Sequence, residues 1–165
     1  MTLAQAAALQ FIDFATPANE EDVRAATAEL AERRLLSAEQ AQAVDTAKLV
    51  RFLRSPLAER LRKAEKVERE YRFFLLDEAK NYDSAVTGDD RVLVQGVVDC
   101  FFEQDGELVV VDFKTDRVEG EALLARAEEY RPQLELYAKA LSRVLGMRVR
   151  EKILYFFHTD TALEL

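Results

Sequence analysis

The sequence predicts an α/β fold with a mixed central sheet, flanking helices and an N-terminal helical layer, in one domain over residues 1–165. Three observations predict this architecture. Residues 1–66 carry helix-capping and helix-forming patterns and no strand pattern. Residues 67–116 contain three strand patterns, and the last two are joined by a tight turn. After them come helical sequence and a final strand, a crossover that places the final strand parallel to the one before the helical sequence.

Composition and charge limit the classes of function. A chain of 165 residues with 49% apolar residues is long enough to bury a core. The net charge of −8 argues against free-standing nucleic-acid binding, unless the chain is one module of a larger machine whose other parts hold the nucleic acid. The sequence shows no membrane-spanning run and no signal-peptide pattern, so we expect a cytoplasmic protein without a membrane partner. Its single cysteine, Cys100, excludes an intramolecular disulfide.

The first part of the chain is predicted to form short helices over residues 2–14, 19–34, 37–53 and 55–64. Asn19, Ser37 and Ser55 are suitable N-cap residues because their side-chain oxygens can accept from free backbone N–H groups. Ser37 and Gln40 fit a capping box, and Pro56 is suited to the first position of a helix. This segment therefore forms the helical layer, 1–66, beside a core of residues 67–165.

Strands are predicted over residues 67–76, 92–103 and 107–116, with a loop or wide hairpin connection at 77–90. Asp105-Gly106 between the second and third strands is a strong signal for a two-residue hairpin turn, because both residues tolerate positive φ. A turn of two residues also fixes the register of the strands. It places Asp99 directly opposite Asp112, with Cβ atoms roughly 5 Å apart.

Two facing carboxylates suggest a site for a hard divalent cation such as Mg²⁺ or Mn²⁺. Side chains alternate along a strand, so Lys114 shares the face of Asp112 while Phe113 points to the other face. The implied chemistry is metal-assisted hydrolysis, with Lys114 orienting water or neutralising developing charge. The alternative for the Asp112-x-Lys114 pair alone is that it marks the point where a strand leaves the core. We expect Glu70, on the first strand, to pair with a neighbouring arginine.

The C-terminal part is predicted to contain a short helix near residues 122–127, a second helix that begins at Arg131-Pro132 and ends at Gly146, and a strand over 149–157. Gln133 and Tyr137 are four residues apart and share a helix face. The alternative to a site role is a core Tyr137 with its hydroxyl at the rim and a solvated Gln133. The sole histidine, His158, is expected at the surface.

The ordered set Gly96-Val-Val-Asp99, Asp112-Phe-Lys114-Thr-Asp116 and Gln133-Leu-Glu-Leu-Tyr137 resembles the RecB-like nucleases of the PD-(D/E)XK superfamily. The chain is most similar to the nuclease domain of the AddA subunit of AddAB-type helicase-nucleases. The segments Ala8–Asp13 and Arg69–Phe73 share this resemblance, which covers most of the chain and is looser over residues 15–66. The resemblance implies a restriction-endonuclease-like fold.

The resemblance also implies roles for particular residues. Asp99, Asp112 and the backbone carbonyl of Phe113 would bind Mg²⁺ or Mn²⁺, and Lys114 would be catalytic with the two aspartates. Supporting or DNA-binding roles are implied for three further residues, Gln133, Tyr137 and Thr115. The implied substrate is single-stranded DNA, cleaved by an exonuclease in double-strand break repair and recombination. The implied partners are a helicase domain of the same parent chain and an AddB-type subunit.

One position departs from the family pattern. The family carries a metal-binding histidine in the first helix, where this chain has Ala6, or alternatively Gln5. The absent histidine and the acidic surface leave open a second function, a catalytically silent scaffold that docks a helicase or partner protein. A third reading is a different hydrolase on the same fold, because metal-site motifs specify metal chemistry better than substrate.

Overall fold

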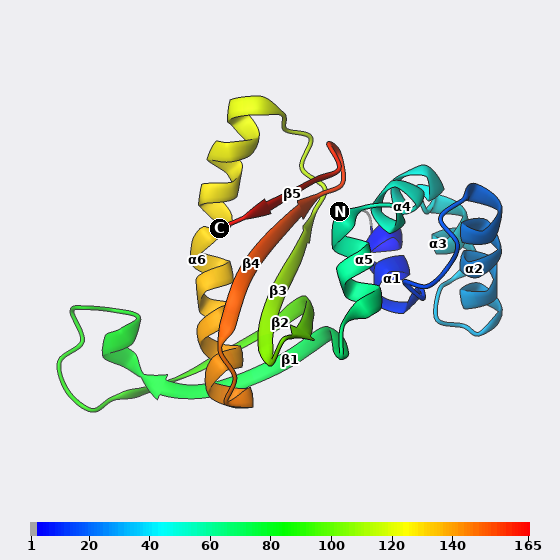
Figure 1. Cartoon of the computed structure of the whole chain (residues 1–165). Coiled ribbons are helices and arrows are strands. Elements are labelled where there is room, and N and C mark those ends of the chain that lie inside the picture. Colours follow the sequence, from blue (N-terminus) through cyan, green and yellow to red (C-terminus); the bar gives the residue numbers. More distant parts are fainter. Residues whose placement is uncertain (1–2) are drawn as a thin grey trace.

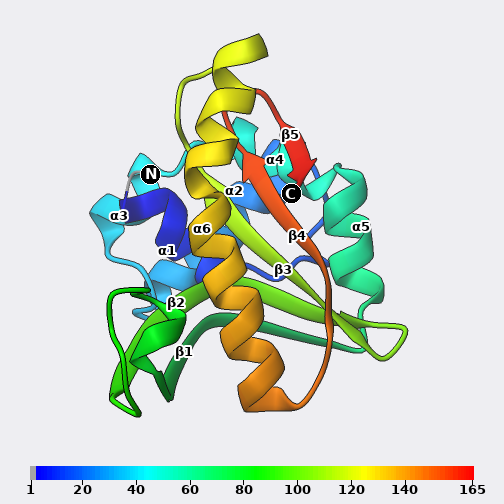
Figure 2. The same cartoon turned by 90° about the vertical axis from the view of Figure 1, so that its left-hand side faces the viewer.

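The computed structural model describes residues 3–165 and has a five-stranded sheet with helices on both faces (Figure 1). The strand order is β1-β2-β3-β4-β5, with β3 and β4 parallel and the other neighbouring pairs antiparallel. A long helix, α6, lies across one face, and helices α1–α5 lie on the other side (Figure 2). The predicted mixed sheet with flanking helices is therefore confirmed.

The helical layer consists of five helices, α1 Leu3–Phe11, α2 Glu20–Glu32, α3 Ala38–Ala43, α4 Thr46–Leu53 and α5 Pro56–Lys63. The predicted caps Asn19, Ser37 and Ser55 each accept a hydrogen bond from a backbone N–H of the following helix, and Ser37 and Gln40 form the full capping box. The expected start of the first helix at residue 2 lies outside the described residues.

The single helix predicted over residues 37–53 is wrong, because the chain breaks between α3 and α4. Val44 is extended, with ψ of 127°, and the side chain of Asp45 accepts from Lys48 N and starts a new helix. The backbone N–H of Asp45 donates to Gln5 Oε1 of α1 at 3.1 Å. A second cap and a contact from another helix therefore override the helical periodicity of the sequence.

The predicted hairpin register is confirmed. Strands β1 Lys66–Glu78, β2 Arg91–Gln104 and β3 Glu107–Lys114 form the antiparallel part of the sheet. Asp105 and Gly106 both have positive φ, 55° and 75°, and Gln104 pairs with Glu107. The same register continues to Cys100 opposite Val111, one step before Asp99 and Asp112.

Helix α6 is one continuous helix, Gly120–Leu145, with Pro132 inside it, so the predicted break at Arg131-Pro132 is wrong. Proline removes one backbone hydrogen bond and does not stop a helix that has a large apolar face to bury. That face, which packs on the sheet, includes Leu123, Ala127, Leu134, Tyr137, Ala140 and Leu141. Gly146 ends the helix with φ of 67°, as predicted.

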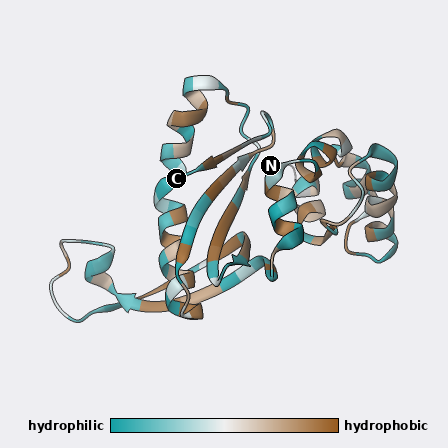
Figure 3. Cartoon of the chain, in the orientation of Figure 1, coloured by the Kyte–Doolittle hydropathy of each residue, from teal (hydrophilic) through white to brown (hydrophobic). Residues whose placement is uncertain are grey.

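Strand β4, Val149–Phe156, follows α6 and runs parallel to β3, as predicted. A short fifth strand, β5 Thr161–Glu164, was not predicted, and it pairs with β4 at the edge of the sheet. The apolar colouring in Figure 3 follows the inner strands, while the connection between β1 and β2 is mostly hydrophilic. Among the helices described, none combines the length and apolar character that crossing a membrane requires.

Two main cores hold the sheet between its helical layers. On the side of α1–α5, an aromatic cluster of Phe52, Phe113, Tyr155 and Phe157 packs with ring centroids 4.9–6.4 Å apart. On the side of α6, Phe73, Phe101 and Tyr137 pack with aliphatic residues of β2, β3 and α6. Phe113 and Asp112 therefore face opposite layers, as strand alternation predicts.

The connection between β1 and β2 extends away from the rest of the molecule (Figure 1). The buried carboxylate of Asp77, near the end of β1, anchors the start of this connection to α6. Asp77 forms ion pairs with Lys139 and Arg143 and accepts hydrogen bonds from Asn81 and Tyr82. These contacts hold the pKa of Asp77 well below its usual range, chiefly through the bond from Arg143. On the parts of β1 and β2 next to this connection, the side chains of Phe74, Leu76 and Leu93 are exposed.

Candidate functional site

The β2–β3 ladder ends at Cys100 opposite Val111, and the side chain of the preceding residue, Asp99, makes the next contact with β3. Asp99 Oδ2 accepts a hydrogen bond of 3.0 Å from the backbone N–H of Phe113. The carboxylate is thereby tied to the main chain of β3, immediately after Asp112. The sequence-derived register thus brings the two aspartates together.

Asp112 lies on the face of β3 toward α6 and is only 2% exposed. Burial, followed by the nearby charge of Asp99, raises the pKa of Asp112 despite the opposing effect of Lys114. Its Oδ2 atom is fully buried and forms an ion pair with the ammonium of Lys114. Lys114 offsets only part of the cost of burying this charge, because the pKa of Asp112 stays raised, and a further cation would stabilise the carboxylate.

Lys114 is directed at Asp112 and at one face of α6. Its ammonium forms the ion pair with Asp112 and donates to Gln133 Oε1 at 3.2 Å. Gln133 Nε2 in turn donates to the Tyr137 hydroxyl at 2.7 Å. Gln133 is therefore part of the site's hydrogen-bond network and is not merely solvated, while the Tyr137 ring packs in the core and its hydroxyl meets Gln133.

Gly96 provides space for this packing. A Cβ atom at Gly96 would lie 2.8 Å from the Phe73 ring and 3.4 Å from Tyr137 Cε1. Only glycine leaves these two aromatic rings where they are. The glycine of the Gly96-Val-Val-Asp99 segment therefore supports the position of Tyr137, whose hydroxyl accepts from Gln133.

Phe113 contributes its backbone to the site. Its N–H donates to Asp99, and the N–H and C=O of one strand residue point to the same neighbouring strand. The Phe113 carbonyl is thus directed toward β2 at a point where the β2–β3 ladder has ended. A small cavity of about 10 Å³ lies here, close to the minimum for one water-sized occupant. Ala6, Leu9, Gln10, Glu70, Asp99 and Phe113 line it.

Glu70 belongs to this cavity, and its predicted ion pair with an arginine is not found within residues 3–165. It has a positive φ of 51°, unusual for a non-glycine residue, and interrupts the β1–β2 pairing opposite Asp99. Burial and the charge of Asp99 raise its pKa. The interruption could not be anticipated from the alternating sequence of β1, although that sequence did place Glu70 on a strand near the aspartates.

Two other predicted positions lie at the margin. Thr115 is half-buried just after β3, and its side chain makes no hydrogen bond with the residues described. Ala6 of α1, the position at which the resemblance implies a histidine, lines the cavity. His158 is exposed, as predicted, and lies 3.2 Å from Glu119.

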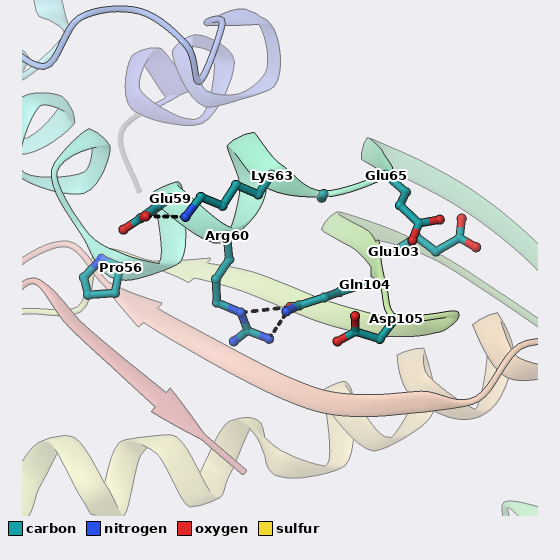
Figure 4. A pocket seen from close by; sticks show the side chains of 9 residues that line it. Pro56, Glu59, Arg60, Lys63, Glu65, Glu103, Gln104 and Asp105 are labelled. Atoms are coloured by element: carbon teal, nitrogen blue, oxygen red, sulfur yellow. Dashed lines mark hydrogen bonds and ion pairs between the residues drawn. The ribbon is translucent and has the colours of Figure 1, made fainter.

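A much larger cavity, of about 490 Å³, lies beside the Asp105 turn at the far end of the hairpin from Asp99 (Figure 4). Arg60 reaches into it from α5, but its guanidinium is already bound by Gln104 and, in bidentate fashion, by Glu151. Lys63 is paired with Glu59 in the same view. Size alone therefore does not identify the site, whereas the buried Asp112–Lys114 pair beside Asp99 does.

The residues around Asp99 and Asp112 fit a divalent cation by three observations. The donors are hard oxygens, burial and the charge of Asp99 raise the pKa of Asp112 despite Lys114, and a small cavity lies beside Asp99 and Phe113. Within residues 3–165, no set of three or more carboxylate, histidine or cysteine side chains is arranged to hold a metal by itself. The set is two carboxylates and a backbone carbonyl, which are the oxygen donors that Mg²⁺ and Mn²⁺ prefer.

Comparison with protein families matches residues 3–163 to the PD-(D/E)XK nuclease superfamily. Nucleases of this superfamily generally use divalent metal ions. Among curated proteins, the chain is 37% identical over 159 residues to an ATP-dependent helicase/nuclease subunit of Alkaliphilus oremlandii, and 40% identical over 156 residues to the protein of that name in Desulforudis audaxviator. These alignments cover 95% and 93% of this chain, which spans 13% of the length of each relative.

A solved structure, "Crystal structure of SSO0001", aligns with 97% of this chain and 64% of its own chain, at 17% identity and a TM-score of 0.45. The family assignment stands on the match over residues 3–163, together with the carboxylates and lysine that the fold brings together. The chain belongs to the PD-(D/E)XK nuclease superfamily.

Proposed function

We propose that this chain is a Mg²⁺- or Mn²⁺-dependent deoxyribonuclease module that hydrolyses phosphodiester bonds of single-stranded DNA. The observation that carries the proposal is the buried Asp112 carboxylate, which is paired with Lys114, lies beside Asp99 and has a raised pKa. Such an arrangement of two acids and an amine on a rigid sheet suits metal-assisted phosphodiester hydrolysis.

Each residue has a distinct role in this proposal. Asp99, Asp112 and the Phe113 carbonyl hold the divalent ion, which when bound polarises a phosphoryl oxygen and lowers the pKa of water. Glu70 adds negative charge at the cavity beside Asp99. Lys114 orients the attacking water or neutralises charge that develops on the phosphate, and Gln133 holds its ammonium at 3.2 Å. Tyr137 supports Gln133, and Thr115, half-buried just after β3, is the proposed further contact to DNA.

The substrate and partners are proposed from the named relatives. Both are helicase/nuclease subunits, and this chain spans only 13% of the length of each. We infer that the chain acts as the nuclease part of a longer helicase-nuclease in the cytoplasm, together with a partner of the AddB type. A helicase motor would deliver single-stranded DNA to an exonuclease acting in double-strand break repair, which removes the need for a basic surface on a module of net charge −8.

One observation favours a second candidate, a catalytically silent scaffold that docks a helicase or partner protein. Ala6 lines the cavity at the place where the family carries a histidine ligand, so this member would bind metal with fewer protein groups. A scaffold would keep the fold and the buried aspartates but would hold no ion between them.

Cleavage of labelled single-stranded DNA in the presence of Mn²⁺ tests the proposal. We expect cleavage by the wild type and loss of cleavage in Asp112→Ala and Lys114→Ala, while Asp105→Asn, a matched change in the distant turn, retains activity. Thermal melting confirms that each variant is folded. Activity that survives both site changes would contradict the assignment, and absence of cleavage together with absence of metal binding would favour the scaffold.

A further inference from the structure

The ammonium of Lys114 has a third neighbour besides Asp112 and Gln133. It lies 3.8 Å from the centroid of the Tyr130 ring, within the range of a cation–π contact. The Lys114 side chain is only 13% exposed, so this contact is largely shielded from water. An ammonium group has three donor directions, and an ion pair, an amide oxygen and an aromatic face take up all three.

The Tyr130 side chain also makes hydrogen bonds through its hydroxyl. Its hydroxyl lies 3.1 and 3.2 Å from the two carboxylate oxygens of Asp116, which follows β3, and it accepts from Arg126 at 3.0 Å. Arg126 Nε donates to Asp116 Oδ1 at 2.8 Å. Burial and the hydrogen bond to Asp116 raise the pKa of Tyr130, so the phenol stays protonated.

Helix geometry places the α6 side chains around Lys114 on one face of the helix. Arg126, Tyr130, Gln133 and Tyr137 follow each other at spacings of four, three and four residues, and therefore share the face of α6 that meets β3. The continuity of α6 through Pro132 is what keeps Arg126 and Tyr130 in register with Gln133 and Tyr137. A helix broken at Pro132 would not present these four side chains as one row.

We propose that Tyr130 is a positioning residue whose aromatic ring fixes the Lys114 ammonium beside Asp112, with the hydrogen bonds of its hydroxyl in a secondary role. A lysine has a flexible four-carbon stem, and catalysis requires its charge at a defined point. The inference deepens the proposed function and rests on it for its kinetic consequence. The geometric part, the placement of Lys114 against the ring, can be tested without any activity.

Two substitutions separate the ring from the hydroxyl. Tyr130→Phe keeps the aromatic face and loses the bonds to Asp116 and Arg126, whereas Tyr130→Leu removes the aromatic face. With Mn²⁺ and single-stranded DNA, we expect Tyr130→Leu to lower kcat by roughly threefold to thirtyfold with little change in KM, which is the range a shielded cation–π contact supplies. Tyr130→Phe should keep kcat within about threefold of the wild type. Tyr130→Met serves as a second ring-free variant if the leucine variant does not fold.

Nuclear magnetic resonance of the lysine side chains provides the readout that is independent of activity. The aromatic ring should shift the ε-methylene protons of Lys114 upfield in the wild type and in Tyr130→Phe, and the shift should be lost in the ring-free variant. A signal that does not move on removal of the ring would overturn the proposal. So would equal losses of kcat in the Phe and Leu variants, or none in either. If the wild type does not cleave DNA yet shows the upfield signal, the proposed function fails while the placement of Lys114 stands.

Discussion

Asp99 Oδ2 lies 3.0 Å from the backbone nitrogen of Phe113, so a side chain completes the β2–β3 pairing where the backbone ladder stops. This hydrogen bond fixes the Asp99 carboxylate next to Asp112. It uses only one of the two carboxylate oxygens of Asp99. It also leaves the Phe113 carbonyl at the open end of the ladder. The end of one strand pair therefore creates the proposed ligand set.

Divalent metal is predicted to stabilise the fold. An ion that binds only the folded chain adds about 2.7 kcal/mol to the free energy of unfolding when its concentration is a hundred times Kd. We expect Mn²⁺ to raise the melting temperature of the wild type and to raise that of Asp112→Asn much less. Calorimetric melts with and without Mn²⁺ measure this, with Asp105→Asn as a control that should behave like the wild type. An equal rise in all three proteins would mean that the ion binds elsewhere.

Metal affinity is predicted to fall with decreasing pH. Burial and the charge of Asp99 raise the pKa of Asp112 above its unfolded value, so the folded chain holds this proton more tightly than the unfolded chain does. In the metal-free protein, the ionisation of Asp112 therefore costs stability as pH rises from about 4 through the raised pKa. Because metal ligands must be deprotonated, protonation of Asp112 competes with Mn²⁺ over the same interval.

Titration calorimetry from about pH 7 down to about pH 5 checks this competition. We expect Kd for Mn²⁺ to increase as the pH falls, and the dependence to be weaker in Asp112→Asn. The same pH dependence in the wild type and in Asp112→Asn would show that another group controls binding.

Histidine at position 6 is predicted to tighten metal binding, because Ala6 of α1 lines the cavity with Glu70, Asp99 and Phe113. An imidazole nitrogen there would add one protein ligand to a set of oxygens. Calorimetric titration of Ala6→His with Mn²⁺ should give a lower Kd than the wild type. Ala25→His, the same change at an exposed position of α2, is the matched control and should leave Kd unchanged. No difference between Ala6→His and Ala25→His would mean that this helix does not face the ion.

Gly96→Ala is predicted to destabilise the protein, because the new Cβ would lie 2.8 Å from the buried Phe73 ring. Overpacking of this kind typically costs about 1–3 kcal/mol of unfolding free energy. Denaturant unfolding measures the loss. The double variant Gly96→Ala/Phe73→Leu makes room for the methyl group, so the two changes should cost less together than the sum of their separate costs. Strict additivity would contradict a clash between these two positions.

The sequence was sufficient for the register of the site because one local feature determines it. Asp105 and Gly106 adopt the positive φ values that a two-residue turn requires, and each pairing up to Cys100 and Val111 follows from that turn. Strand alternation then separates Phe113 from Asp112. Both are short-range properties that residue types specify directly.

Other features depend on tertiary contacts and were missed or mispredicted. Two helix predictions failed in opposite directions. Helix α6 continues through Pro132 because its apolar face is buried on the sheet. The helix predicted over 37–53 is broken at Val44 because Asp45 caps a new helix. The edge strand β5 has only four residues and gains its order from pairing with β4. The positive φ of Glu70 and the contact of Tyr130 with Lys114 join distant segments, and local patterns carry no information on them.

Diffraction from crystals soaked in Mn²⁺, recorded with anomalous scattering from manganese, tests the central claim most directly. We expect one anomalous peak bounded by the carboxylates of Asp99 and Asp112 and the carbonyl of Phe113, and no peak there in crystals of Asp112→Asn. Crystals of the wild type that take up manganese at other positions but show no peak between the two aspartates would contradict the account.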